Sequence, residues 1–150
     1  MRRAMAAARK GTRQGQTPFG ACIIRRGEMV ALCHNQVWRT TDITAHAEIQ
    51  AIRQACRKLK TVSLNDCALY STCEPCPMCF SASHWAGISK IYFGADIQDA
   101  HQAGFNELFI PALKMKSDGK SPVRVYGGLL KEENVLLLKE WSSLKGKKVY

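Results

Sequence analysis

The sequence contains no long apolar run. None of its hydrophobic segments approaches the roughly 18 consecutive apolar residues of a membrane-spanning helix. The basic, alanine-rich start at Met1 also lacks the apolar core of a secretory signal. The seven cysteines are odd in number and mostly stand within apolar segments, where an unpaired cysteine behaves as a small buried hydrophobe. We therefore expect no membrane association and a reducing compartment, the cytoplasm, rather than a disulfide scaffold.

Internal repeats and low-complexity tracts are also absent. The only linker-like stretch is Lys116–Pro122 (KSDGKSP), which is short enough to be a loop within one domain. The chain has 150 residues, of which 46% are hydrophobic and 23% charged, and these values are typical of one globular domain. We therefore expect a single domain over residues 1–150.

Acidic residues are few, with 12 against 22 lysines and arginines, and the formal net charge is +10. Basic residues gather near the two ends, in Arg2–Arg13 and Lys145–Lys148, and are scattered in between. A protein that binds nucleic acid usually concentrates its positive charge on one face or along one helix. The scattered distribution favours a role in solubility, so we do not expect nucleic acid as the main partner.

Hydrophobic spacing predicts an alternation of strands and helices. A turn joins the first two strands, which gives an antiparallel hairpin, whereas strands joined through a helix require crossovers and pair in parallel. We expect an α/β fold, a three-layer αβα sandwich with a mixed central sheet of about five strands. The predicted strands are 19–26, 29–35, 67–71, 88–93 and 123–126, and the predicted helices are 2–13, 47–59, 75–86, short segments within 98–115, and 129–144.

The strongest chemical signal is His46-Ala47-Glu48 followed by Pro75-Cys76-Pro77-Met78-Cys79. Two cysteines three residues apart at a helix start share one face, and the positive end of the helix favours thiolates. Together with His46 they make three ligands, which leaves a tetrahedral zinc with the open position of a catalytic site. A lone CxxC could also be a redox pair or half of a structural zinc site, but the chain has no second CxxC. We therefore predict a Zn²⁺ site formed by His46, Cys76 and Cys79.

Glu48 lies on the predicted apolar stripe of its helix, with Ile52, Ala55 and Leu59 at i+4, i+7 and i+11. A carboxylate directed at a core is costly unless another group engages it. Beside a zinc-bound water, whose pKa is about 7, it can accept a proton and deliver it to a leaving nitrogen. The combination of HxE and PCxxC is the signature of zinc-dependent nucleobase deaminases, so we predict that activity.

The segments TAHAEIQAIRQACRKL and CALYSTCEPCPMCFSA resemble the cytidine deaminase-like superfamily, most closely its small bacterial guanine deaminases. The likeness runs from Pro18 to Tyr150 and includes the AGF segment at residues 103–105. This resemblance implies a homodimer that hydrolyses the free base guanine to xanthine and ammonia. It also implies that Asn35 binds the base, that Phe19 stacks on it and that Trp85 forms a further wall. From the residues alone, Asn35 could equally close its strand and Phe19 could belong to the core.

The chain departs from the family pattern at two places. Ile43 replaces a proline before the zinc histidine, and Asn106-Glu107 replaces two aspartates after the AGF segment. Glu107 keeps a carboxylate, so we predict that it contacts substrate or handles protons, and the departure bears on guanine specificity more than on deamination. An enzyme acting on cytosine, a nucleoside or an aminotriazine, or a tRNA adenosine deaminase, remains an alternative. A non-catalytic zinc scaffold or RNA-binding subunit descended from a deaminase is disfavoured because no structural zinc needs Glu48.

The C-terminal tail, residues 145–150 (KGKKVY), has the composition of a frayed basic end. The resemblance implies a different role, because small guanine deaminases often close the active site with a C-terminal segment that is exchanged between subunits. We therefore predict that Tyr150 covers the bound base, in a homodimer that is domain-swapped through this segment.

Overall fold

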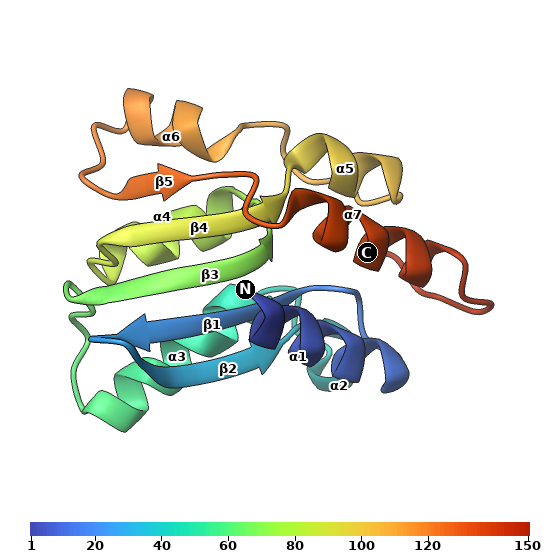
Figure 1. Cartoon of the computed structure of the whole chain (residues 1–150), viewed down its shortest axis with the longest axis horizontal. Helices are drawn as coiled ribbons and strands as arrows, with labels where there is room; N and C mark the ends of the chain where they lie inside the picture. Colours follow the sequence, from blue (N-terminus) through green and yellow to red (C-terminus); the bar gives the residue numbers. More distant parts are fainter.

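Five strands form a mixed sheet in the order β2-β1-β3-β4-β5 through the middle of the structure (Figure 1). The computed structural model describes all residues from 1 to 150. Strand β1 pairs antiparallel with both β2 and β3, whereas β3, β4 and β5 run parallel. The mixed sheet and its hairpin therefore confirm the predicted fold. The strands are β1 Gly20–Arg25, β2 Glu28–His34, β3 Cys67–Cys73, β4 Lys90–Ala95 and β5 Arg124–Tyr126.

Helices cover both faces of this sheet. In Figure 1, α1 and α7 lie in front of the strands and α3 and α4 lie behind them, which gives the three predicted layers. None of the helices is long and apolar enough to cross a membrane. The helices are α1 Arg2–Arg13, α2 Val37–Thr40, α3 Ala47–Leu59, α4 Pro77–Trp85, α5 Ile97–Gln102, α6 Ala112–Asp118 and α7 Lys131–Ser142.

Alanines bring two of the helices close to the sheet. On α3, Ala47, Ala51 and Ala55 are fully buried on the face that meets the strands. Helix α1 approaches β1 so closely that a Cβ atom at Gly20 would lie 2.1 Å from the carbonyl oxygen of Ala4. Small residues at these positions fix the height of each helix above the sheet, and thereby the positions of the residues at its start.

Several element boundaries differ from the sequence prediction. Strand β3 continues to Cys73 and β4 is shifted two residues towards the C-terminus, so both strands reach further towards the start of α4. Helix α4 begins at Pro77 rather than Pro75, because the residue before a proline avoids the helical conformation and Cys76 is extended. The short helix α2 was not predicted. It is a single turn without an apolar period, which hydrophobic spacing cannot detect.

The buried carboxylate of Glu74 joins three parts of the fold. Its Oε2 accepts a hydrogen bond from the backbone N–H of Ile97 at 3.1 Å, and its Oε1 accepts one from Ala112 at 2.7 Å. These residues open α5 and α6, where backbone N–H groups lack helical partners and a negative charge is favoured. Glu74 therefore anchors the starts of α5 and α6, on either side of the irregular segment 103–111.

We predict that Glu74→Ala lowers the free energy of unfolding by about 2 to 4 kcal/mol, because it leaves two buried N–H donors without an acceptor. Urea denaturation followed by circular dichroism measures this change. Glu28→Ala is the control, since Glu28 is exposed and has no hydrogen-bonded partner. Equal urea midpoints for the two variants would contradict an anchoring role for Glu74.

Candidate active site

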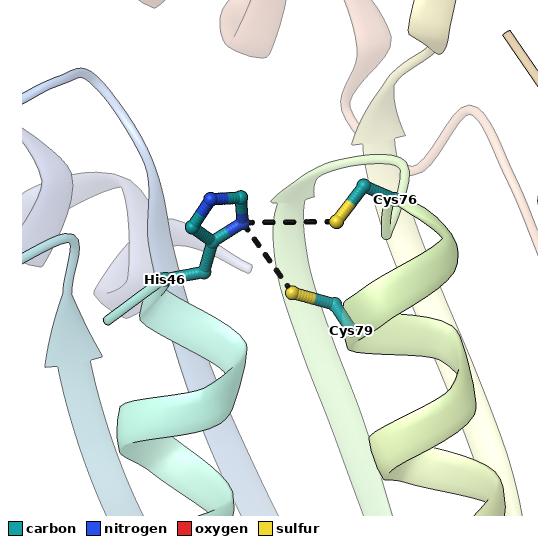
Figure 2. A group of neighbouring side chains, drawn as sticks. All are labelled: His46, Cys76 and Cys79. Atoms are coloured by element: carbon teal, nitrogen blue, oxygen red, sulfur yellow. Dashed lines mark hydrogen bonds between the residues drawn. The ribbon is translucent and has the colours of Figure 1, made fainter. Parts of the chain in front are cut away.

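The starts of α3 and α4 meet at one end of the sheet and bring together the three predicted metal ligands (Figure 2). His46 is the N-cap residue of α3, Cys76 is the N-cap residue of α4, and Cys79 lies in the first turn of α4. The His46 Nδ1 atom is 3.7 Å from the Cys76 Sγ and 3.5 Å from the Cys79 Sγ. All three donor atoms lie within 4.8 Å of one another.

This geometry fits a tetrahedral zinc ion. Bonds of about 2.3 Å to sulfur and about 2.0 Å to nitrogen, at tetrahedral angles, place sulfur and nitrogen about 3.5 Å apart. The separations between His46 and the two cysteines match this value closely. No fourth cysteine, histidine or carboxylate joins the group, so the ligand set is that of a catalytic site with one open position.

The electrostatic setting favours a cation between the ligands. A hydrogen bond from the Cys79 thiol, assisted by one from His46, lowers the pKa of Cys76 to about 4 despite its burial. The same interaction with Cys76 and burial raise the pKa of Cys79 well above its usual range. Zn²⁺ bound between the two cysteines would hold both sulfurs as thiolates.

Glu48 lies directly beside the ligands, where the sequence predicted a catalytic carboxylate. Its side chain is 5% exposed, and its Oε1 accepts a hydrogen bond from the Ser71 hydroxyl of β3 at 3.0 Å. Burial raises the pKa of Glu48, whereas the neighbouring His46 opposes this rise. A carboxylate with one oxygen bonded to Ser71 is fixed in orientation, as a general acid and base requires.

A cavity of about 260 Å³ opens beside the ligands. Its wall combines the start of α4 with the irregular segment after α5 and the end of the chain, and it is largely apolar. Such a lining with few polar groups is typical of a site for a small flat molecule. The lining residues are Ile43, His46, Cys76, Pro77, Met78, Phe105, Asn106, Glu107, Leu108 and Tyr150.

Glu107 carries the one side-chain carboxylate in the lining of this cavity. Its Oε2 atom is buried and has no hydrogen-bond partner. Burial, and next the negative charges of Cys76 and Glu48, raise the pKa of Glu107 to about 8. A zinc cation held nearby would lower this pKa again and favour the ionised form. Buried polar atoms are rarely left unpaired, so Glu107 has the environment of a ligand-binding group.

Asn35 and Tyr150 are bonded to each other in this structure. The Asn35 side chain is 0% exposed, and its Nδ2 donates a hydrogen bond to the Tyr150 hydroxyl at 2.6 Å. Its Oδ1 accepts one from the backbone N–H of Val37 at 3.0 Å. The Tyr150 ring lies 5.6 Å from the His46 ring, between centroids. Tyr150 thus forms a wall of the cavity, whereas Asn35 lies behind it and would reach a base only if Tyr150 moved.

Phe19 and Trp85, the predicted aromatic walls, do not line the cavity. Phe19 is buried behind Phe105, with ring centroids 4.7 Å apart in an edge-to-face arrangement. Phe105, which sequence reasoning did not single out although it ends the AGF segment, is the phenylalanine of the cavity wall. Trp85 is 85% exposed at the far end of α4, about 9 Å along the helix axis from Cys79, so it points to solvent within one chain.

Comparisons with known proteins agree with this geometry. Residues 1–95 match the model of the cytidine and deoxycytidylate deaminase zinc-binding region. The chain is 38% identical to the guanine deaminase of Bacillus subtilis over 151 aligned positions, which cover 100% of this chain and 96% of that protein. A tRNA-specific adenosine deaminase of Agrobacterium fabrum is 34% identical, with 94% of this chain and 90% of that protein covered.

Solved structures give the same result. A guanine deaminase from Nitrosomonas europaea superposes with a TM-score of 0.87 at 30% identity, covering 94% of this chain and 82% of that one. The Bacillus subtilis guanine deaminase superposes with a TM-score of only 0.70, although it is 36% identical and the alignment covers 98% of this chain and 94% of that one. The Bacillus subtilis enzyme is therefore more similar in sequence but superposes less well on this structure.

We predict that the purified protein contains about one zinc per chain and that Cys79→Ala removes it, because each ligand supplies one of only three protein bonds. Metal analysis by mass spectrometry measures the content. Cys33→Ala is the matched control, since Cys33 is a free cysteine that lies outside the cluster, and it should retain zinc. A wild-type protein that is active without metal would refute the assignment.

Proposed function

This chain belongs to the cytidine and deoxycytidylate deaminase family and is a zinc-dependent aminohydrolase, and from this premise we propose that it deaminates the free base guanine to xanthine and ammonia. The likeness to the guanine deaminase of Bacillus subtilis, which spans the whole chain, is the observation that carries the proposal. All seven cysteines are unpaired, which supports the cytoplasm as the place where the enzyme works.

The residues of the site have separate roles in the proposed reaction. His46, Cys76 and Cys79 would hold the zinc ion, which would supply a water of low pKa, about 7 in catalytic zinc sites. Glu48 accepts a proton from the attacking water and delivers it to the departing amino group, which leaves as ammonia. Its bond from Ser71 keeps the carboxylate aimed at the same place in both steps. The apolar wall around the cavity keeps other water away from the base.

Glu107 supports guanine as the base. An ionised carboxylate only accepts hydrogen bonds. Guanine presents two donors side by side, its ring N1–H and its 2-amino group, which match the two oxygens of a carboxylate. Adenine and cytosine place an unprotonated ring nitrogen next to their amino group, and this nitrogen would face a carboxylate oxygen unfavourably. The Oε2 atom of Glu107 has no hydrogen-bond partner within the protein, which supports this role.

The alternative of a tRNA adenosine deaminase finds less support in the cavity. A flipped nucleotide in RNA brings phosphate groups to the mouth of the site, and such sites carry basic side chains there. No lysine or arginine lines the cavity beside the zinc ligands. The small volume and apolar wall are better suited to a free base.

We predict that guanine gives the highest kcat/KM in a panel with adenine, cytosine, guanosine, an aminotriazine and a tRNA anticodon stem-loop, by about tenfold or more. Ammonia release measures all six. Glu48→Gln is the control for contaminating activity: it should keep zinc but lose at least about 10² in rate, the low end of general acid–base catalysis. If cytosine or the triazine gave the highest value, the proposed base would be wrong, and if only the RNA reacted, the tRNA alternative would hold.

We further propose that the enzyme is a homodimer whose two chains exchange their C-terminal tails, residues 145–150. After α7 the tail turns at Gly146, which has φ of +72°, and returns to place Tyr150 against the site. The carbonyl of Lys148 accepts a hydrogen bond from the Trp38 indole at 3.2 Å. The same contacts could form between two chains, because the remainder of the tail is exposed.

We predict that removal of Val149 and Tyr150 lowers kcat/KM for guanine by about tenfold or more, equivalent to about 1.4 kcal/mol, with zinc retained. The physical reason is loss of the aromatic wall that excludes water and contacts the base. Tyr150→Phe is the matched control, since it keeps the ring and removes only the hydroxyl that bonds Asn35.

Mixing the truncated protein with Glu48→Gln protein should restore part of the activity if tails are exchanged, since heterodimers would contain one complete site. Absence of rescue would place the tail within its own chain. A lower KM after truncation would instead mean that Tyr150 competes with the base for Asn35, contrary to the proposal.

A further inference from the structure

A second, larger cavity of about 610 Å³ lies at the open edge of the sheet, away from the zinc ligands. It runs along the outer side of β2, with α1 on one side and α3 on the other, at the lower edge of the sheet in Figure 1. Its lining residues share none with the candidate active site. They are Arg3, Ala6, Ala7, Lys10, Leu32, Cys33, His34, Gln36, Arg39, Gln50, Gln54 and Arg57.

The two helices contribute regular stripes to this cavity. Residues 3, 6, 7 and 10 of α1 stand at i, i+3, i+4 and i+7, and residues 50, 54 and 57 of α3 stand at i, i+4 and i+7. Each set therefore lies on one face of its helix. Gln54 also covers the sheet edge, because its Oε1 accepts a hydrogen bond from the backbone N–H of Leu32 at 3.1 Å. The cavity is thus a groove between two helix faces, with Gln54 across part of the β2 edge.

Four positive side chains line the groove: Arg3 and Lys10 from α1, Arg39 from α2, and Arg57 from α3. No aspartate or glutamate is among the lining residues, and none of the four cations takes part in a salt bridge. Elsewhere on the surface, arginines such as Arg9 and Arg25 do have carboxylate partners. Unpaired like charges around one cavity repel one another, and a bound anion would relieve this repulsion.

Neutral polar groups complete the lining. Gln36, Gln50 and Gln54 present side-chain amides, and the Oε1 of Gln36 is buried with no hydrogen-bond partner. An amide can both donate to phosphate oxygens and accept from the N–H or O–H groups of an attached organic part. The volume lies within the usual range of small-molecule sites, about 300 to 1,000 Å³.

We infer that this groove, which we call the β2-edge groove, is a binding site for a small phosphorylated molecule with two or more negative charges, such as a nucleoside diphosphate. Arginine and lysine side chains bind phosphate oxygens through charge-assisted hydrogen bonds, and arginine can do so in a bidentate manner. The glutamine amides face the remainder of the ligand. The site is independent of the proposed deamination, because it shares no residue with the cavity beside the zinc ligands.

Isothermal titration calorimetry on the zinc-loaded full-length protein tests this inference. The probes are pyrophosphate, adenosine 5′-diphosphate and adenosine, and zinc content is measured after each titration so that metal removal is not mistaken for binding. We expect one pyrophosphate or one nucleoside diphosphate per chain and no binding of adenosine at the same concentrations. Tighter binding of the nucleoside diphosphate would identify a nucleotide as the ligand class, whereas equal affinities would identify the phosphate groups alone. Raising the salt concentration should weaken both.

Alanine variants of the lining residues test whether the phosphorylated probes bind in the β2-edge groove. The double variant Arg3→Ala/Arg57→Ala should weaken binding about tenfold or more, and Lys10→Ala should weaken it by a smaller factor. Lys58→Ala is the matched control for Lys10→Ala, since Lys58 is exposed on α3 outside the groove and should bind as the wild type does. All four substituted side chains are exposed, so melting temperatures should stay unchanged.

Three results would overturn the inference. The first is no binding of either phosphorylated probe by the wild type. The second is equal loss of binding in Lys10→Ala and Lys58→Ala, which would show only a general charge effect. The third is binding of a 12-nucleotide single strand without binding of the small probes, which would make the groove a nucleic-acid surface. None of these measurements uses guanine turnover, so they leave the proposed function untouched.

Discussion

The site depends on the contact between two helix starts. His46 caps α3 and Cys76 caps α4, and their donor atoms are 3.7 Å apart although 30 positions separate them in the chain. Strand β3 makes this possible, because it leads from the end of one helix to the start of the other across the sheet. Both helix starts present N–H groups and a partial positive charge to the same small space. Thiolates, a carboxylate and a metal with its water can be held together there with little reorganisation.

Negative charge is concentrated around that space. Glu48, Glu74 and Glu107 all lie near Cys73 at the end of β3, and the protein accommodates each carboxylate differently. Glu74 is satisfied by two backbone N–H groups, and Glu48 is bonded by Ser71, whereas one oxygen of Glu107 has no partner. The first therefore has a structural role, and the other two are the carboxylates to which we assign roles in the proposed reaction. A doubly charged cation at the centre would favour the ionised forms of Glu48 and Glu107.

The sequence was sufficient to predict helices with a regular apolar period and the metal ligands that stand in short motifs. Apolar periodicity predicted α3 to the residue, and the HxE and PCxxC spacings predicted the metal ligands. It was insufficient where distant segments meet. Phe105, rather than Phe19, lines the cavity, and Tyr150 bonds Asn35, because the segment after α5 and the tail are placed by tertiary contacts without a period of their own. Positive charges that look scattered in the sequence converge in the β2-edge groove for the same reason.

The alanine face of α3 limits which substitutions this enzyme can accept. Ala47, Ala51 and Ala55 leave no space between helix and sheet, so the separation of the two layers is set by methyl groups. Any larger residue there would lift the helix, and with it both His46 and Glu48, away from Cys79 and Ser71. These alanine positions therefore tolerate little change, although none of them lines the cavity. Substitutions in the cavity wall at Ile43, Met78 and Leu108, by contrast, can change which base is accepted and leave the metal ligands and Glu48 in place.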